Sequence, residues 1–166
     1  ANSNPKILKI ISQYGFGADC VSGGEIQAAI DAGFPPSKIV YAGVGKSDWE
    51  INLGLDNNIF CFNVESTAEL EVINTLASQR NKVANVAFRI NPNIGAHTHA
   101  NITTGLAENK FGIAMDDLEK TIEISTRLKN ISVIGLHFHI GSQILDMDDF
   151  KALSNRINDL QSRLKQ

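Results

Sequence analysis

Two histidines and a Gly-Ser pair end an apolar stretch of the sequence. His137 and His139 are separated by one residue, and Gly141 and Ser142 follow them. Because successive side chains on a β-strand point to opposite faces, we expect both imidazoles to line one face of a strand. The Gly-Ser pair then offers backbone N–H groups and a hydroxyl at the carboxyl end of that strand, where parallel α/β folds bind anions and other ligands. The alternative is a buried strand whose histidines are hydrogen-bonded core residues.

Polar side chains also stand near the ends of the other predicted strands. Asp19, Tyr41 and Asn63 end the first three, and Arg89 and Asn91 end the fourth. Active sites of β/α barrels are built at this end of the strands, so the pattern predicts a ligand site there. A helix-capping or loop-tying role is the alternative for Asp19.

An arginine on the inward face of a strand needs an anionic partner. Arg89 shares its predicted face with Asn91, and an unpaired buried charge is prohibitively costly. We expect Asp19 or Glu25 to supply the carboxylate. The alternative is an ion pair with a purely structural role.

Residues 91–112 form a long polar connection that carries His97 and His99. A compact domain seldom keeps a loop of about 20 residues without a use. The H-x-H pairs here and at 137–139 could ligate zinc, but no nearby Cys or carboxylate completes a recognisable ligand set. We therefore expect hydrogen-bonding or stacking histidines and no metal, with a zinc-dependent hydrolase as the alternative.

The elements that must hold these residues alternate between strand and helix. Apolar runs predict strands at 17–21, 39–43, 59–64, 84–91 and 132–140. Helical spacing predicts helices after Pro5 and at 25–32, 46–55, 66–79, 115–128 and 147–164. Such alternation indicates parallel strands with helical crossovers, in a doubly wound sheet or a (β/α)8 barrel. Because a complete barrel takes about 250 residues, we expect an α/β fold, an incomplete TIM barrel of about five parallel strands.

Composition narrows the class of protein. The 166 residues carry a formal net charge of −3 and no basic run, which argues against nucleic acid or a membrane surface as partner. No stretch approaches the roughly 20 apolar residues of a membrane span. Cys20 and Cys61 both lie in apolar runs, which favours reduced thiols and a cytoplasmic location.

Several motifs together resemble the fold-type III pyridoxal-phosphate decarboxylases, whose barrel is similar to that of alanine racemase. The matching segments run nearly end to end and include Gly17-Ala18-Asp19-Cys20-Val21-Ser22-Gly23-Gly24-Glu25, Ile39-Val40-Tyr41-Ala42-Gly43, Phe88-Arg89-Ile90-Asn91-Pro92 and His137-Phe138-His139-Ile140-Gly141-Ser142-Gln143. The resemblance implies that residues 1–166 are part of a pyridoxal-phosphate-binding β/α-barrel domain, without the family's C-terminal β domain.

The resemblance also implies roles for single residues. His139 would stack on the pyridine ring of pyridoxal 5′-phosphate, and Gly141 and Ser142 would reach its phosphate. Asp19, Glu25 and Arg89 would form a charge network around the ring, and His137, deeper in the barrel, would be structural. The implied catalytic residues are His139, Glu25, Asp19 and Arg89, and the implied cofactor-binding residues are His139, Gly141, Ser142 and Asp19.

Further expectations follow from the family pattern. Its Schiff-base lysine is expected just upstream of Ala1, so this stretch alone is expected to be inactive. The full-length protein is expected to be a homodimer that acts on a small amino acid.

The segment from His97-Thr98-His99 to Lys110-Phe111-Gly112 resembles the corresponding segment of one branch of this family. The enzymes of that branch convert meso-2,6-diaminopimelate to L-lysine and CO2. The alternatives are an ornithine, arginine or carboxynorspermidine decarboxylase, or a non-catalytic homologue that acts by binding a partner.

Overall fold

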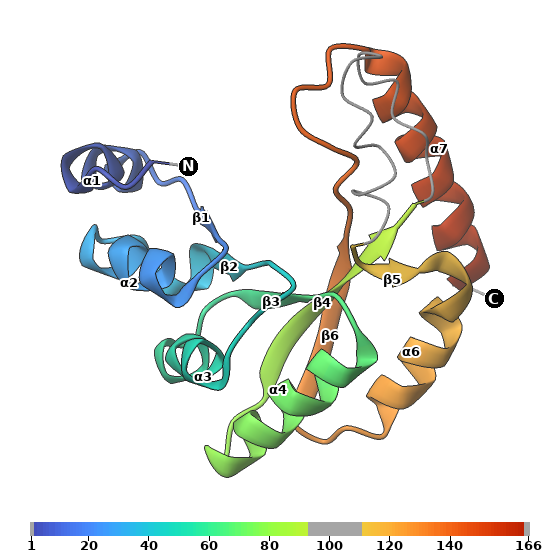
Figure 1. Cartoon of the computed structure of the whole chain (residues 1–166), viewed down its shortest axis with the longest axis horizontal. Helices are drawn as coiled ribbons and strands as arrows, with labels where there is room; N and C mark the ends of the chain where they lie inside the picture. The colour runs from blue at the N-terminus through green and yellow to red at the C-terminus, as the bar shows by residue number, and fades with distance from the viewer. Residues whose placement is uncertain (1, 93–110, 165–166) are drawn as a thin grey trace.

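The computed structural model describes residues 2–92 and 111–164, which form a curved sheet with helices outside it (Figure 1). The helices are α1 (Pro5–Gln13), α2 (Gly23–Asp31), α3 (Asp48–Asn57), α4 (Thr67–Gln79), α6 (Leu118–Thr126) and α7 (Met147–Leu164). The strands are β1 (Ala18–Cys20), β2 (Ile39–Tyr41), β3 (Cys61–Val64), β4 (Ala84–Asn91), β5 (Ile113–Ala114) and β6 (Ile131–His137). Short 3-10 turns, η1 (Pro36–Lys38) and η2 (Met115–Asp117), precede β2 and α6.

The strands are parallel and follow the chain order. β1, β2, β3 and β4 are successive neighbours, and β6 pairs with β4 on its other side. β5 pairs with the last residues of β4. Each crossover places its helix on the outer side of the arc (Figure 1). The prediction of parallel β/α units in sequential order is confirmed, and the order does not reverse midway as it would in a doubly wound sheet.

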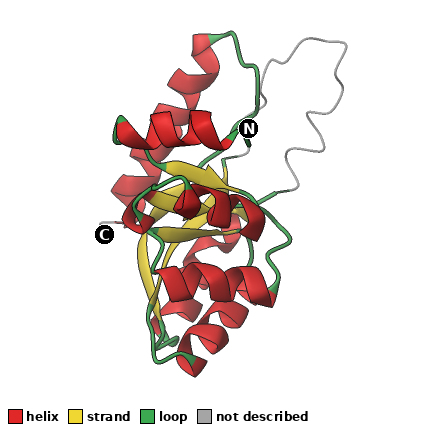
Figure 2. Cartoon of the chain, turned by 90° about the vertical axis from the view of Figure 1, so that its left-hand side faces the viewer, coloured by secondary structure: helices red, strands yellow, loops and turns green. Residues whose placement is uncertain are grey.

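The register of the strands divides the sheet into a convex and a concave face. Partners in register share a face, so Tyr41 lies beside Phe62, and Phe62 beside Val86. These side chains are buried beneath the helices, which lie in front of the strands in the side view (Figure 2). A Cβ added to Gly54 of α3 would come within 2.8 Å of the Phe62 ring. The main core therefore lies between the convex face and the helices.

The concave face carries the polar side chains. Asp19 is in register with Val40, Asn63 with Ala87, and Arg89 with His137. Tyr41 was grouped with these residues in the sequence, but its register with Phe62 places it on the convex face. The two strand faces thus separate an apolar core from a polar wall.

Strand β6 departs from its predicted form in two ways. It ends at His137, so the prediction that His139 lies within the strand was wrong. Val133 pairs with Val86 while Gly135 pairs with Ala87, which leaves Ile134 as an extra residue in a bulge. A bulge interrupts the alternation of side chains, and Ile134 is accordingly not aligned with Leu136 as a strict period of two requires.

Smaller differences occur at other boundaries. β5 was not predicted, and α6 begins at Leu118 because η2 occupies the start of the predicted helix.

Residues 93–110, which include His97 and His99, lie outside the described residues. Within the described ranges, no helix is both long and apolar enough to cross a membrane.

Phe88 offers a test of the convex core. Its side chain is fully buried, whereas Phe60 is 47% exposed. We expect Phe88→Ala to lower the free energy of unfolding by about 3–5 kcal/mol, because it removes buried surface and leaves a cavity. Phe60→Ala is the matched control and should cost less than about 1 kcal/mol. Chemical denaturation of both variants measures the difference, and equal losses would contradict this assignment of the core.

Candidate functional site

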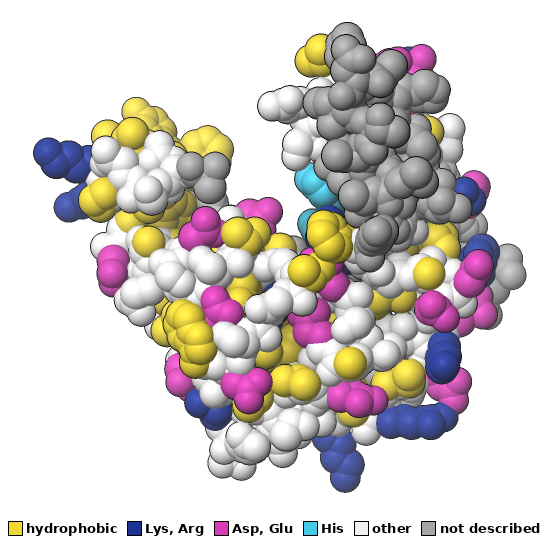
Figure 3. Space-filling model, viewed as in Figure 1, with side chains coloured by type: hydrophobic (Ala, Val, Ile, Leu, Met, Phe, Trp, Pro, Cys, Tyr) yellow, Lys and Arg dark blue, Asp and Glu magenta, His cyan; other side chains and the backbone are white. Residues whose placement is uncertain are grey.

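The polar wall gathers at the carboxyl ends of β3, β4 and β6. Arg89 and His137 are direct register partners. The charges of Arg89, Asp19, His139 and Glu65 act on the pKa of His137, so these groups lie within electrostatic range of that side chain. The space-filling view shows histidine side chains facing the hollow of the arc, with acidic side chains below them (Figure 3). The structure therefore brings together Asp19, Arg89 and His139, which the sequence had singled out.

Arg89 is held by a carboxylate that the sequence analysis did not name. Its Nη1 donates to Glu65 Oε1 at 2.8 Å, and both side chains are largely buried. Its guanidinium also lies 5.5 Å from the centroid of the Phe111 ring. The prediction that Asp19 or Glu25 is the partner of Arg89 was wrong, because the end of β3, not that of β1, lies next to β4. The signal that could have found Glu65 is its place one residue after the third predicted strand.

Glu25 instead organises the turn between β1 and α2. Its Oε2 accepts from the backbone N–H of Val21 at 2.7 Å, while its own N–H donates to Ser22 Oγ at 3.2 Å. Glu25 and Asp19 also line an open pocket of about 590 Å³ between α1, β1 and α2. Asp19 and Glu25 thus also line the edge of the sheet that β1 forms.

The residues after β6 form an exposed turn. His139 and Ser142 are exposed, and Gly141 is half-buried. Gly141 has φ +135° and Gln143 φ +58°, conformations that turn the backbone sharply and that glycine adopts at little cost. The imidazole and the hydroxyl are accordingly presented to the outside at the carboxyl end of the sheet.

His137 lies deeper than His139. Burial, followed by the nearby Arg89 charge, lowers the pKa of His137 below its ordinary value. The imidazole is therefore neutral at pH 7, with one nitrogen donating and the other accepting. Its Nδ1 is buried and has no hydrogen-bond partner among the described residues.

The rim of the wall repeats one pattern of helix capping. A serine begins each of α2, α3 and α4, and a glutamate follows three positions later. At α3 the Glu50 carboxylate accepts from the N–H groups of Ser47 at 3.0 Å and Gly23 at 2.7 Å. These bonds, first among them the one from Gly23, lower the pKa of Glu50 to about 2. Glu50 thereby ties the start of α3 to the start of α2.

Lys46 is a second buried cation, and the sequence analysis assigned it no role. Its Nζ donates to Gly43 O at 2.6 Å, Asn63 O at 2.8 Å and Glu69 Oε1 at 2.6 Å, and its side chain is 0% exposed. All three ammonium donors are therefore used, so Lys46 is not free to react with an aldehyde. It ties the loop after β2 to the end of β3 and the start of α4.

The thiols and the described metal-ligating groups contribute no reactive centre. Burial raises the pKa of Cys20 and of Cys61 to about 11, so both stay protonated at neutral pH. Both are free and buried. Within residues 2–92 and 111–164 there is no cluster of three or more His, Cys, Asp or Glu side chains that could hold a metal ion.

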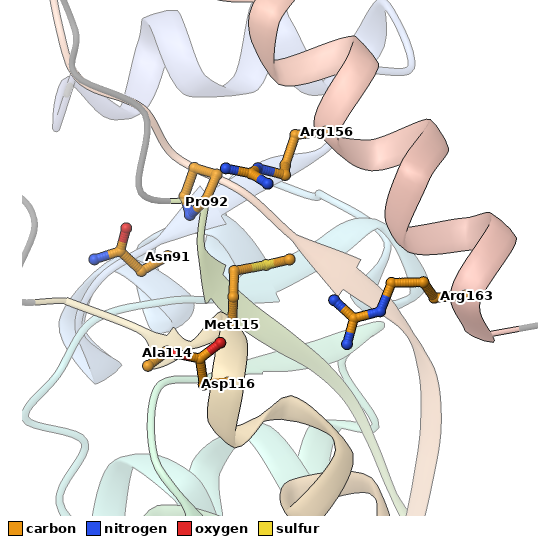
Figure 4. Close-up of a pocket in the computed structure, with 7 residues that line it drawn as sticks. All are labelled: Asn91, Pro92, Ala114, Met115, Asp116, Arg156 and Arg163. Carbon is orange, nitrogen blue, oxygen red and sulfur yellow. The ribbon is translucent and has the colours of Figure 1, made fainter.

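A separate pocket of about 280 Å³ lies between the end of β4, η2 and α7. The close-up shows Arg156 and Arg163 extending from α7 toward Pro92, Met115 and Asp116 (Figure 4). Arg163 is already paired with Glu119 at 2.8 Å. This pocket lies beside the concave wall and shares none of its lining with the residues that surround His137.

The chain matches a protein-family model over residues 1–166, and that family is described as "Pyridoxal-dependent decarboxylase, pyridoxal binding domain". Diaminopimelate decarboxylase of Bacteroides thetaiotaomicron is 70% identical over 165 residues, which are 99% of this chain and 43% of that protein. Diaminopimelate decarboxylase of Aquifex aeolicus is 43% identical over 166 residues, 100% of this chain and 40% of that protein.

A solved structure is similar as well. The crystal structure of diaminopimelate decarboxylase from Helicobacter pylori complexed with L-lysine matches with a TM-score of 0.86 and 42% identity, covering 98% of this chain and 42% of that one. The chain therefore spans less than half the length of the relatives it matches.

Lys46 offers a test of the buried network. We expect Lys46→Met to lower the free energy of unfolding by about 3–5 kcal/mol, because it leaves the carboxylate of Glu69 buried without its cation. Lys151→Met is the control: that lysine pairs with Asp148 at 2.6 Å, but its side chain is 73% exposed, so the loss should stay below about 1 kcal/mol. Urea denaturation of both variants measures the two free energies of unfolding. A loss below about 1 kcal/mol for Lys46→Met would show that Lys46 does not stabilise the network.

Glu50 gives the protein a defined response to acid. Its pKa lies near 2 in the folded state and near the ordinary 4.5 in the unfolded state. The stability from its hydrogen bonds is therefore complete above pH 4.5 and is lost as the pH falls toward 2. In Glu50→Gln the free energy of unfolding should be lower at neutral pH and should fall less steeply across this window. Denaturation midpoints at several pH values measure the slope, and an unchanged slope would contradict the role of Glu50.

Proposed function

Because this chain belongs to the family of pyridoxal-dependent decarboxylases and matches their pyridoxal-binding domain, we propose that the whole protein decarboxylates meso-2,6-diaminopimelate to L-lysine and CO2. The observation that carries the proposal is the 70% identity to a diaminopimelate decarboxylase over 99% of the chain. The cofactor of the family is pyridoxal phosphate, which supplies an electron sink for the charge that remains when CO2 leaves.

The described residues fit such a cofactor. The turn at Gly141 presents the Ser142 hydroxyl and backbone N–H groups, which suit a phosphate. The exposed imidazole of His139 precedes this turn and suits the face of an aromatic ring. On the concave face, Glu65 Oε2 is a buried polar atom without a partner among the described residues, as expected of a wall that a polar ligand completes.

We assign each side chain a separate task. Ser142 and Gly141 would hold the phosphate, and His139 would stack on the ring and orient it. Arg89, kept in place by Glu65 at 2.8 Å, provides a fixed positive charge at the wall. Asp19 and Glu25 supply negative charge at the edge of the sheet formed by β1, where both line one pocket. Orientation of this kind can contribute several kcal/mol to catalysis, because the bond that breaks must be aligned with the ring.

We also propose the setting in which the protein works. The full-length protein is a homodimer and works in the cytoplasm. Two free, buried thiols support the location, since reduced cysteines are typical of that compartment.

The proposal is tested with the full-length protein in the presence of pyridoxal phosphate. We expect release of CO2 and formation of L-lysine from meso-2,6-diaminopimelate, and much lower turnover of ornithine and arginine. Preference for ornithine or arginine would assign the protein to another branch of the family. Cofactor binding without turnover of any of these amino acids would favour a non-catalytic homologue.

His139 provides the sharpest test of the cofactor assignment. Stacking contributes about 1 kcal/mol beyond buried area, so His139→Ala should weaken the affinity for pyridoxal phosphate about fivefold. Turnover should fall by about 100-fold, because a tilted ring misaligns the reacting bond. His139→Phe keeps an aromatic face and should recover most of the affinity. Cofactor titration and steady-state rates measure both effects, and equal affinities for Ala and Phe variants would exclude stacking.

A further inference from the structure

Glu65 has a carboxylate oxygen that the fold leaves unused. Its side chain is 5% exposed, and Oε1 accepts from Arg89 at 2.8 Å. The backbone N–H of Glu65 is bound to Glu69 Oε2 at 3.0 Å, so the residue is fixed at the end of β3. Its Oε2 is buried with no hydrogen-bond partner among the described residues. An unpaired buried polar atom is costly and rare in native proteins, and a carboxylate oxygen can only accept.

A second unused atom lies on the same wall. His137 Nδ1 is buried and also has no partner in the described part of the chain. His137 is the register partner of Arg89, and the charge of Glu65 acts on it. Arg89 therefore has two neighbours on the wall: Glu65, with which it forms an ion pair, and His137, its register partner. Each of these two neighbours has one polar atom without a partner among the described residues.

The convex side of the strands offers neither atom a partner. On that side lie the buried residues Val64 and Phe88 and the partly buried Leu136, whose side chains have no polar group to offer. The missing partner must therefore come from the concave side, where Asp19 and His139 also lie. A carboxylate oxygen can only accept, and Nδ1 of a neutral imidazole accepts when the ring proton is on Nε2, so a group with an O–H or N–H bond would satisfy either atom.

We propose that Glu65 is a positioning residue of the cofactor site. Its Oε1 orients the guanidinium of Arg89, and its Oε2, together with His137 Nδ1, binds an O–H or N–H group that arrives with pyridoxal phosphate and its amino-acid substrate. This inference rests on the proposed function and adds to it a residue outside the family motifs quoted from the sequence. It also gives His137 a role beyond the structural one expected from its depth.

Glu65→Gln separates the two tasks of the carboxylate. The amide oxygen still accepts from Arg89, so the fold and the melting temperature of the cofactor-free protein should change little. The amide nitrogen replaces Oε2 and presents a donor to a donor, so the bound group is repelled. We expect the affinity for pyridoxal phosphate, measured by absorbance titration of the full-length protein, to fall about tenfold, the effect of one lost hydrogen bond. Turnover should fall with it.

Glu119→Gln is the matched control. Glu119 forms an ion pair with Arg163 at 2.8 Å, but its side chain is 74% exposed. Its cofactor affinity and turnover should equal those of the wild type. If Glu65→Gln also binds pyridoxal phosphate and turns over like the wild type, Glu65 only holds Arg89 and the inference is overturned. The inference is also overturned if cofactor affinity in both variants falls only in proportion to a lowered melting temperature.

The titration also keeps this inference apart from the proposed function. A wild-type protein that binds pyridoxal phosphate but does not decarboxylate diaminopimelate would overturn the substrate assignment, while the tenfold difference between wild type and Glu65→Gln would still support the role of Glu65. The double variant Glu65→Gln/His137→Asn extends the test. If both atoms hold the same group, the second substitution should add little to the loss of affinity, whereas fully additive losses would separate His137 from Glu65.

Discussion

Two buried cations hold the carboxyl ends of the strands together. Lys46 joins the loop after β2 to β3 and α4, and Arg89 joins β4 to the end of β3 through Glu65. A buried cation requires a carboxylate at hydrogen-bonding distance, so each pair fixes the relative position of two neighbouring elements. The geometry of the wall, from Asn63 to His137, depends on these two contacts more than on the exposed ion pairs of the helices.

The separation of stability from chemistry follows from the period of the strands. Phe62 and Phe88 face the helices, while Asn63 and Arg89, their immediate neighbours in sequence, face the hollow. The same backbone therefore supports an apolar core on one side and a charged wall on the other. Parallel strands bring all carboxyl ends to one edge, which places residues from β1, β3, β4 and β6 around a single site even though more than 100 positions separate Asp19 from His137.

The wall is rigid at its base and open at its rim. Its deeper members are held by fixed contacts. Glu65 is held by its ion pair with Arg89 and by the hydrogen bond from its backbone N–H to Glu69. His137 is held by the pairing of β6 with β4. His139 and Ser142 lie beyond the last strand residue and are exposed. In such a site the charged groups that act on a ligand are already in position, while His139 and Ser142 remain accessible to it. The neutral His137 adds no charge to the wall, and the protonated thiols add no thiolate.

The sequence by itself determined the parallel β/α order and the need of Arg89 for an anion, because these depend on local spacing and on the cost of a buried charge. It could not select Glu65 over Asp19 or Glu25, since that choice depends on which strand lies beside β4. It could not place the bulge at Ile134 or end β6 at His137, because strand pairing across β4 sets both. Only the tertiary structure brought Lys46 to Glu69 and left Glu65 Oε2 and His137 Nδ1 without partners, since such contacts arise from neighbours that are distant in sequence.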